Sequence, residues 1–533
     1  MKQQLNTDRK GLLGAAAPFL VLVACALSYS NALEGPFVFD DLPAIVDNDL
    51  LPPSTFSDCL SAPAGSTASG RPLVALSFAL NHALSGDEVF GWHATNLLLH
   101  LLSALALFGL ARETLARMGN VRASSLATTI TLAWALHPLL TDAVNLVASR
   151  SELFVSFFYL LVLYCLTRSA TKKKPWAALC VLACALGMAS KEVMVSAPLV
   201  AFAWDRYFLS ESWSAAWKER RGLYLGLAST WIVLGLCVWS AERGESISLA
   251  ALAVSPFESL CTQAGAITHY LRLLLWPSPL SIDYAGWPVA SGLSTVLPQA
   301  LLIFGLIGTS IWRLRSGHRD GLLFLGALAL LAPSSSVIPL TGELVAEHRM
   351  YLASAPLIAL LLLGLERLSG QRSFLAVSLT LCLALGLTTH RRNQDWSTEL
   401  ALWSTTTSTR PDNARAWNSL GVALKRLERA EEAEEAWKTA LSHDPSEFHA
   451  HGNLGELYAR QEDAKQAIFH FREAVRLRPE HPELLLNLGS MLFATGASNE
   501  AEVHLVQALA VAPEDWNLRE KAERRLAAAR RRR

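Results

Sequence analysis

The sequence is dominated by a succession of long apolar runs that begins near residue 11 and ends near Thr389. A run of roughly 20 apolar residues is long enough to cross the hydrocarbon core of a bilayer as a helix. After Trp396 the chain becomes polar, charged and rich in Ala and Leu, as a soluble helical array is. The sequence therefore predicts an all-α protein in two unlike parts, a polytopic membrane helical bundle followed by a soluble helical domain.

Hydropathy predicts about eleven membrane spans. They are residues 11–32, 94–111, 124–144, 151–167, 176–190, 193–208, 223–240, 296–312, 321–340, 350–365 and 372–389. Two further apolar segments, 72–84 and 264–276, are shorter and carry polar side chains. We expect both to lie as helices in the outer membrane interface.

Alternate connections between the predicted spans are rich in Arg and Lys, and all of these connections fall on the side of the N-terminus. They contain Arg112, Arg117, Arg122, Arg168, Lys172, Lys173, Lys174, Lys218, Arg220, Arg221, Arg313, Arg315, Arg319, Arg367 and Arg372. By the positive-inside rule this side is cytoplasmic. An odd number of spans then places the C-terminal domain outside, which for a bacterial inner membrane protein is the periplasm.

The polar C-terminal part repeats itself with a period of about 34 residues, which is the period of the tetratricopeptide repeat (TPR). Gly421, Gly455 and Gly489 recur at this spacing, as do Ala433, Ala467, Ala501 and Pro411, Pro445, Pro479, Pro513. The pattern predicts small residues where two helices cross and a helix end before each Pro. The predicted organisation is a membrane domain at 1–395, a linker at 396–411, three TPR repeats forming an α-solenoid at 412–513, and a capping helix with a basic tail at 514–533.

Ionisable groups gather at the outer ends of the spans, where charged residues near the membrane are costly and usually functional. The groups are Asp40 and Asp41; His137, Asp142, Arg150 and Glu152; Lys191 beside Glu192; and Glu343, Glu347, His348 and Arg349, with Arg71, Arg272 and Asp283 as weaker candidates. Solvated loops, turn chemistry and a surface Lys–Glu pair are the alternative explanations. All these groups lie on one leaflet, whereas a transporter places polar groups near the midplane. A substrate that lies in the membrane and exposes an anionic head, such as a lipid-linked phosphosugar, fits this pattern.

At these positions the sequence resembles the TMTC family, the transmembrane and TPR-containing O-mannosyltransferases, and specifically a bacterial-type member of the GT-C glycosyltransferase class. The matching stretches are 37–41 (FVFDD), 71–73 (RPL), 91–100 (GWHATNLLLH), 137–144 (HPLLTDAV), 149–153 (SRSEL), 190–192 (SKE), 347–352 (EHRMYL) and 396–403. Their ordered succession, followed by the repeats, carries the resemblance. The family's acid in the 137–144 stretch is often Glu where this chain has Asp142.

The resemblance implies a reaction in which one sugar, mannose in the family's name, passes from a polyprenyl phosphate to a protein hydroxyl. A carboxylate is needed to accept the hydroxyl proton, and Asp40 or Asp41 would supply it, with Asp41 preferred. Cations are needed to stabilise the departing phosphate. The candidate residues for binding the donor phosphate and sugar are Arg349, Arg150, Glu152, His137, Lys191, Glu347 and His348.

The resemblance implies no cofactor beyond the lipid-linked sugar, and the sequence contains no metal-ligand set that we recognise. The expected partners are a polyprenyl-phosphate sugar, membrane lipids, and a protein or peptide acceptor held in the TPR groove. Nothing indicates nucleic acid, because the one dense basic run is the tail at 524–533. Two alternatives to the transferase are a non-catalytic TPR membrane scaffold for envelope assembly and a transporter of lipid-linked sugars.

Overall fold

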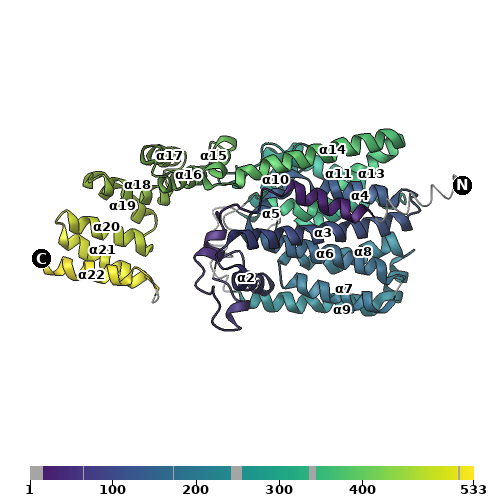
Figure 1. The fold of residues 1–533 in the computed structure, drawn as a ribbon, viewed down its shortest axis with the longest axis horizontal. Helices are drawn as coiled ribbons and strands as arrows, with labels where there is room; N and C mark the ends of the chain where they lie inside the picture. The colour runs from purple at the N-terminus through teal and green to yellow at the C-terminus, as the bar shows by residue number, and fades with distance from the viewer. Residues whose placement is uncertain are drawn as a thin grey trace. The chain divides into compact units, whose positions relative to one another are not determined.

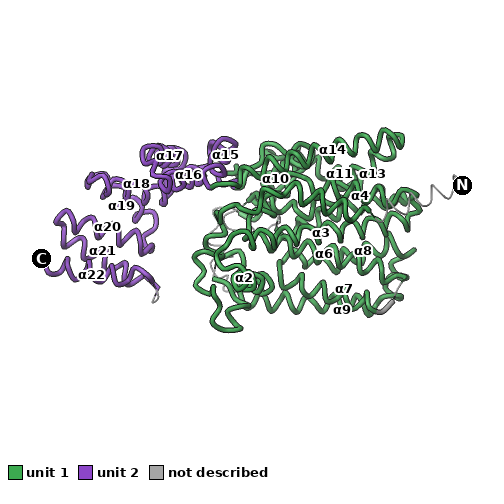
Figure 2. Tube along the Cα trace, in the orientation of Figure 1, with its two compact units in different colours: residues 1–282, 287–398 green, residues 283–286, 399–533 purple. Residues whose placement is uncertain are grey.

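The computed structural model describes residues 16–63, 65–171, 173–241, 255–334, 344–513 and 516–532. Every regular element within these ranges is a helix, which confirms the predicted all-α class. The chain divides into two compact units (Figure 2). The first comprises residues 1–282 and 287–398, and the second comprises residues 283–286 and 399–533.

The first unit is a bundle of apolar helices. In chain order these are Ala16–Ser28, α2 (Pro72–Ser85), α3 (Val89–Arg117), α4 (Ala123–Ala135), α5 (Thr141–Asn145), α6 (Arg150–Ser169), α7 (Lys173–Met188), α8 (Ala197–Trp204), α9 (Trp213–Ser240), α10 (Pro256–Leu275), α11 (Leu297–Arg315), α12 (Gly321–Leu331), α13 (Met350–Leu368) and α14 (Gln371–Arg392). Helix α3 packs against α4 and α6, α6 packs against α7, and α7 packs against α9 (Figure 1). Short turns of helix carry the connections, among them η1 (Leu42–Val46), η3 (Pro138–Leu140), η4 (Val147–Ser149), η5 (Glu192–Ser196), η6 (Asp205–Leu209) and η9 (Glu347–Arg349).

Six helical stretches in the described ranges are long and apolar enough to cross a membrane. They are Val89–Arg117, Val147–Ser169, Trp213–Ser240, Leu293–Arg315, Glu347–Leu368 and Gln371–Trp396. The predicted count of about eleven is therefore not confirmed. The predicted span 124–144 is interrupted, because α4 ends at Ala135 and the chain turns at His137 before Pro138. Proline lacks a backbone N–H and disfavours helical geometry in the residue before it.

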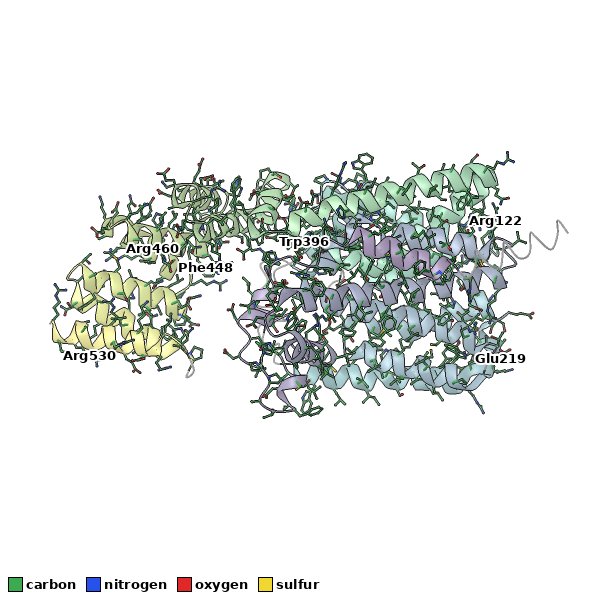
Figure 3. All side chains as sticks on the ribbon, in the orientation of Figure 1. Arg122, Glu219, Trp396, Phe448, Arg460 and Arg530 are labelled. Carbon is green, nitrogen blue, oxygen red and sulfur yellow. The ribbon has the colours of Figure 1, made fainter. Side chains whose placement is uncertain are left out.

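The basic connections lie together at one end of the bundle. Arg122 and Glu219, from two of these connections, are at the end opposite Trp396 (Figure 3). Ion pairs bind this end together, with Arg122 Nη2 at 2.5 Å from Glu366 Oε1 and Arg313 Nη2 at 2.7 Å from Asp320 Oδ2. The side of the membrane on which this end lies stays a prediction.

The second unit is a series of helical hairpins. Its helices are α15 (Glu399–Thr409), α16 (Ala414–Arg426), α17 (Ala430–His443), α18 (Phe448–Arg460), α19 (Ala464–Leu477), α20 (Pro482–Ala494), α21 (Ser498–Val511) and α22 (Arg519–Arg531) (Figure 1). Helix α15 packs on α16 and occupies most of the segment predicted as a linker. The short segment Asp283–Gly286 also belongs to this unit, where Arg415 Nε donates to Asp283 Oδ2 at 2.8 Å.

The three glycines at the repeat period lie where the two helices of each hairpin cross. A Cβ on Gly455 would come within 2.6 Å of the Phe471 ring, and one on Gly421 within 2.4 Å of Trp437. Only glycine allows this close approach, because any larger side chain would displace the aromatic ring that fills the seam. Helix α22 buries Ala522 against the last hairpin, as expected of a capping helix.

Candidate functional site

The two adjacent acids after the first helix occupy unlike environments. Asp41 is fully buried, and its Oδ1 accepts from the Ala148 N–H at 2.6 Å while its Oδ2 accepts from the Val38 N–H at 3.2 Å. Burial raises the pKa of Asp41 to about 8, although the two N–H groups and nearby Arg150 oppose the shift. Asp41 therefore fixes the first loop against η4, whereas Asp40 is only half-buried.

The loop that carries these acids is sharply turned. Phe39, immediately before Asp40, has a φ of 51°, in the left-handed region that large side chains rarely adopt. The conformation sets Asp40 and Asp41 at the start of η1, whose first turn contains Pro43. Because Ala148 binds Asp41, the loop is attached just two residues before the start of α6, the helix that carries Glu152.

Four side chains from four separate segments form an alternating series of acids and bases. His348 Nδ1 lies 3.3 Å from Asp142 Oδ2, and His348 Nε2 lies 3.9 Å from Glu152 Oε1. Glu152 in turn forms an ion pair with Lys191. Asp142 lies on α5, Glu152 on α6, Lys191 before η5 and His348 on η9. The fold thus joins four of the ionisable residues that the sequence singled out, among them Asp142, which the sequence had not assigned to donor binding.

A second ion pair lies beside the first. Arg71 Nη2 is 3.1 Å from Glu192 Oε2, and Arg71 Nη1 is 3.4 Å from Ser151 Oγ. Burial lowers the pKa of Lys191, the charge of Arg71 lowers it further, and Glu152 and Glu192 oppose the shift. The group therefore combines partly desolvated cations with carboxylates, and it stays partly open to solvent at Lys191 and Arg71.

Arg150 serves the packing of the unit. Its guanidinium is fully buried, and it donates to Asn96 Oδ1 at 2.8 Å, to Ser77 O at 3.3 Å and to Trp92 O at 3.1 Å. It also lies over the rings of Phe78 and Trp92, with Arg150 Cζ 4.9 Å and 5.6 Å from the respective ring centres. These contacts join α2, α3 and α6, so the geometry favours a role for Arg150 in holding together the helices that carry the site.

The remaining candidates lie around this group. His137 Nε2 contacts the carbonyl oxygen of Leu274 at 3.0 Å, and buried Glu347 accepts from the Ser281 N–H at 2.7 Å. These contacts join η3 and η9 to α10 and the loop after it. Arg349 is half-buried and donates to Leu344 O at 3.1 Å. Glu343 lies outside the described residues.

Sequence reasoning undervalued a buried polar layer beneath the site. His100 Nδ1 lies 2.7 Å from Tyr351 Oη and its Nε2 lies 3.0 Å from Ala135 O, while Trp134 Nε1 donates to Tyr351 O at 2.9 Å. Asn96, which binds Arg150, lies one turn before His100 on α3. Polar residues four apart in an apolar span are the signal that could have identified this layer.

The arrangement provides a carboxylate that can accept a proton and cations that can bind an anion. Preorganised charges of this kind act strongly where water is partly excluded. In the part of the chain that the structure describes, no group of three His, Cys, Asp or Glu side chains is placed to hold a metal ion.

Comparison with known families gives matches in both units. Residues 69–239 match the family described as dolichyl-phosphate-mannose-protein mannosyltransferase. This region includes Arg71, Asp142, Glu152 and Lys191, whereas Asp40 lies outside it. Residues 412–480 and 458–526 match tetratricopeptide repeat families, which confirms the predicted repeats.

Individual proteins resemble most of the chain. The protein O-mannosyl-transferase TMTC3 of Homo sapiens is 28% identical over 464 residues, which cover 78% of this chain and 49% of the human protein. Tmtc3 of Drosophila melanogaster is 27% identical over 515 residues, covering 80% of this chain and 55% of the fly protein. TMTC2 of Homo sapiens is 27% identical over 522 residues, which cover 78% of this chain and 61% of the human protein. The chain thus spans about half the length of the first two relatives.

Proposed function

Because the chain belongs to the TMTC family, whose relatives above carry the name protein O-mannosyl-transferase, we propose that it is a membrane glycosyltransferase. It moves a single sugar, mannose, from a polyprenyl-phosphate donor to a hydroxyl of a protein. The reaction takes place at the outer face of a bacterial inner membrane, with the TPR repeats in the periplasm. A non-catalytic scaffold needs no buried series of acids and bases, and such groups are costly to keep near a membrane.

The observation that carries the proposal is the joining of Asp142, Glu152, Lys191 and His348 beside the loop of Asp40 and Asp41. Residues about 200 positions apart meet through side-chain contacts at 3.3 and 3.9 Å. A scaffold or a simple anchor gives no reason for such a set. A transferase needs cations to bind a phosphate and a carboxylate to remove a proton, so it accounts for both kinds of charged group.

The half-buried acid, Asp40, is the better candidate for the base. An acceptor hydroxyl loses its proton to this carboxylate as its oxygen attacks the anomeric carbon. Asp41 is the weaker candidate because two backbone N–H groups already occupy its carboxylate and burial favours its protonated form. We assign Asp41 to holding the loop in place.

The cations act on the leaving group. When the bond between the anomeric carbon and the phosphate oxygen breaks, the electron pair goes to that oxygen, and the phosphate gains a second negative charge. Lys191, Arg71 and His348 stabilise this charge, because preorganised donors act where charge develops. Attack from the side opposite the phosphate inverts the anomeric centre. Glu152 holds Lys191, and Arg349 is a further cation within the same short segment as His348.

The TPR unit holds the acceptor protein. Stacked repeats present an extended surface that suits a polypeptide segment, and the repeats recur here with intact helix crossings. Family resemblance and fold are the support for this part of the proposal, since a TPR array alone does not define its ligand.

The proposal is tested by comparing hexose-modified envelope proteins from a host strain with and without the gene. Restoring the chain should restore a set of single-hexose glycopeptides, and restoring the Asp40→Asn variant should not. Asp47→Asn, at an exposed acid of the same loop, is the matched control and should restore the full set. An unchanged glycopeptide profile on deletion would contradict the proposal.

A further inference from the structure

Asp142 is buried at the base of the charged series. Its side chain is 3% exposed, and its Oδ2 accepts from the His348 backbone N–H at 3.2 Å while lying 3.3 Å from His348 Nδ1. Its other oxygen, Oδ1, is buried with no hydrogen-bond partner among the described residues. In the part of the chain that the structure describes, the carboxylate is therefore directed toward one residue, His348.

The turn that carries Asp142 is held by local hydrogen bonds. Pro138 opens η3, and Thr141 Oγ1 donates back to Pro138 O at 2.7 Å. His137 fixes the start of the same turn, because its Nδ1 accepts from the Leu139 N–H at 3.2 Å. A carboxylate on such a turn is held in place before any ligand arrives.

The imidazole of His348 has one edge on Asp142 and the other directed to Glu152. Its side chain is 20% exposed, and Nε2 lies 3.9 Å from Glu152 Oε1. Both ring nitrogens therefore face a carboxylate oxygen, and the imidazolium form can donate from each of them. The ring can thereby offer an N–H to an anion that binds beside Lys191.

Two other buried carboxylates of the unit have both oxygens bound by fixed partners. Asp320 binds Arg313 and Arg367 at 2.7 and 2.5 Å, and Asp205 binds Arg220 and Tyr224. Buried structural acids normally satisfy both oxygens in this way. Asp142 differs from these two because one of its oxygens has no partner among the described residues, while the other contacts an imidazole that is partly exposed.

We propose that Asp142 is the positioning residue for His348, holding the imidazole so that its Nε2–H meets the phosphate of the polyprenyl-phosphate donor as that phosphate departs. The inference rests on the proposed function, and it names the group that stabilises the second negative charge on the leaving phosphate. As the bond to the anomeric carbon breaks, the electron pair goes to the phosphate oxygen, His348 donates a hydrogen bond there, and Asp142 stabilises the imidazolium. The acceptor proton goes to Asp40, so charge and protons balance.

The test measures binding of a short-chain isoprenyl phosphate to the full-length chain in nanodiscs. Asp142→Asn and His348→Gln should each weaken binding about tenfold, since each removes one charged partner of a hydrogen bond. The double variant should be no weaker than His348→Gln alone, because residues that act as a unit are not additive. Asp142→Glu, which keeps the carboxylate, should recover most of the affinity.

The same variants separate positioning from simple folding. Asp320→Asn, a buried carboxylate near the opposite end of the bundle, is the control: it should lower thermal stability without changing the affinity for isoprenyl phosphate. In transfer assays with polyprenyl-phosphate mannose, Asp142→Asn should lower kcat more than it raises KM.

Among the described residues, Asp142 and Glu152 lie against the His348 ring, Lys191 forms an ion pair with Glu152, and Glu347 and Arg349 flank His348 on η9. Additive losses in the double variant, or a loss of stability with unchanged affinity, would overturn the positioning role alone. If the wild-type chain bound no isoprenyl phosphate at all, both the inference and the proposed function would be wrong.

Discussion

Replacement of Arg150 separates support of the fold from donor binding. Arg150→Ala removes the guanidinium that binds Asn96, Ser77 and Trp92 and leaves these acceptors buried. Each hydrogen bond to a charged donor contributes about 1.5 kcal/mol, and the contacts with the two aromatic rings add about 1 kcal/mol. Removing a buried charge recovers part of its desolvation cost, so we expect a net loss of about 3 to 5 kcal/mol.

The assay is thermal unfolding of the detergent-purified chain, followed by tryptophan fluorescence and size-exclusion chromatography. One kcal/mol shifts the Tm of a large domain by roughly 2 °C, so the apparent Tm should fall by about 6 to 10 °C. Arg150→Lys should also lose stability, since a lysine cannot reproduce the planar fork. Arg112→Ala, which removes a partly exposed ion pair between Arg112 and Glu113 at 3.6 Å, is the control and should change the Tm little.

The opposite pattern would refute this reasoning. If Arg150→Lys kept the wild-type Tm while the KM for a polyprenyl-phosphate sugar rose tenfold or more, the guanidinium would act on the donor. The buried position and the three protein acceptors would then describe a state without substrate, and Arg150 would return to the group of donor-binding cations.

Three further predictions follow from single contacts. The pKa of Asp41 is about 8 in the folded chain, against an ordinary value of 3.8, so the folded state keeps a proton that the unfolded chain has lost. The contribution of this proton to stability should fall as the pH rises from about 4 to about 8. The apparent Tm of Asp41→Asn should lack this decline. Gly455→Ala should destabilise the TPR unit by about 1 to 3 kcal/mol in urea unfolding, because its Cβ would lie 2.6 Å from the Phe471 ring. Adding Phe471→Leu should relieve the clash. Full stability of the single variant would contradict the close helix crossing at Gly455. Binding of isoprenyl phosphate should weaken as the pH rises, and it should do so at a lower pH than an ordinary lysine would require, because burial lowers the pKa of Lys191. Lys191→Met should remove this pH dependence. If the dependence persists, another group titrates.

The fold class followed from the sequence because its two signals are strong and independent. Long apolar runs predict membrane helices, and a glycine at every 34th residue predicts the repeats. The number of spans did not follow, because hydropathy averages over breaks such as the turn at Pro138 that divides the predicted span 124–144. Helix α15 was missed for a similar reason, since a polar segment between two domains resembles a linker.

The candidate site was foreseen as a set of residues and not as an arrangement. The sequence grouped His137, Arg150 and Glu152 together because they are close along the chain. In the fold, Arg150 is directed into the packing, while Glu152 meets Lys191 and His348 from distant segments. Distances between segments come from the packing of α3, α5, α6 and η9, which local sequence patterns do not specify. For the same reason, the pairing of Asp142 with His348 could not be read from their spacing.

The most direct test of the account is sugar transfer by the purified full-length chain in liposomes. Polyprenyl-phosphate mannose labelled in the sugar is supplied together with envelope proteins from a strain that lacks the gene. The account predicts that the wild-type chain transfers label to protein and that Asp40→Asn, at equal folded amounts, transfers none. Equal transfer by the two proteins, or an equal amount of label on protein when neither is present, would contradict it.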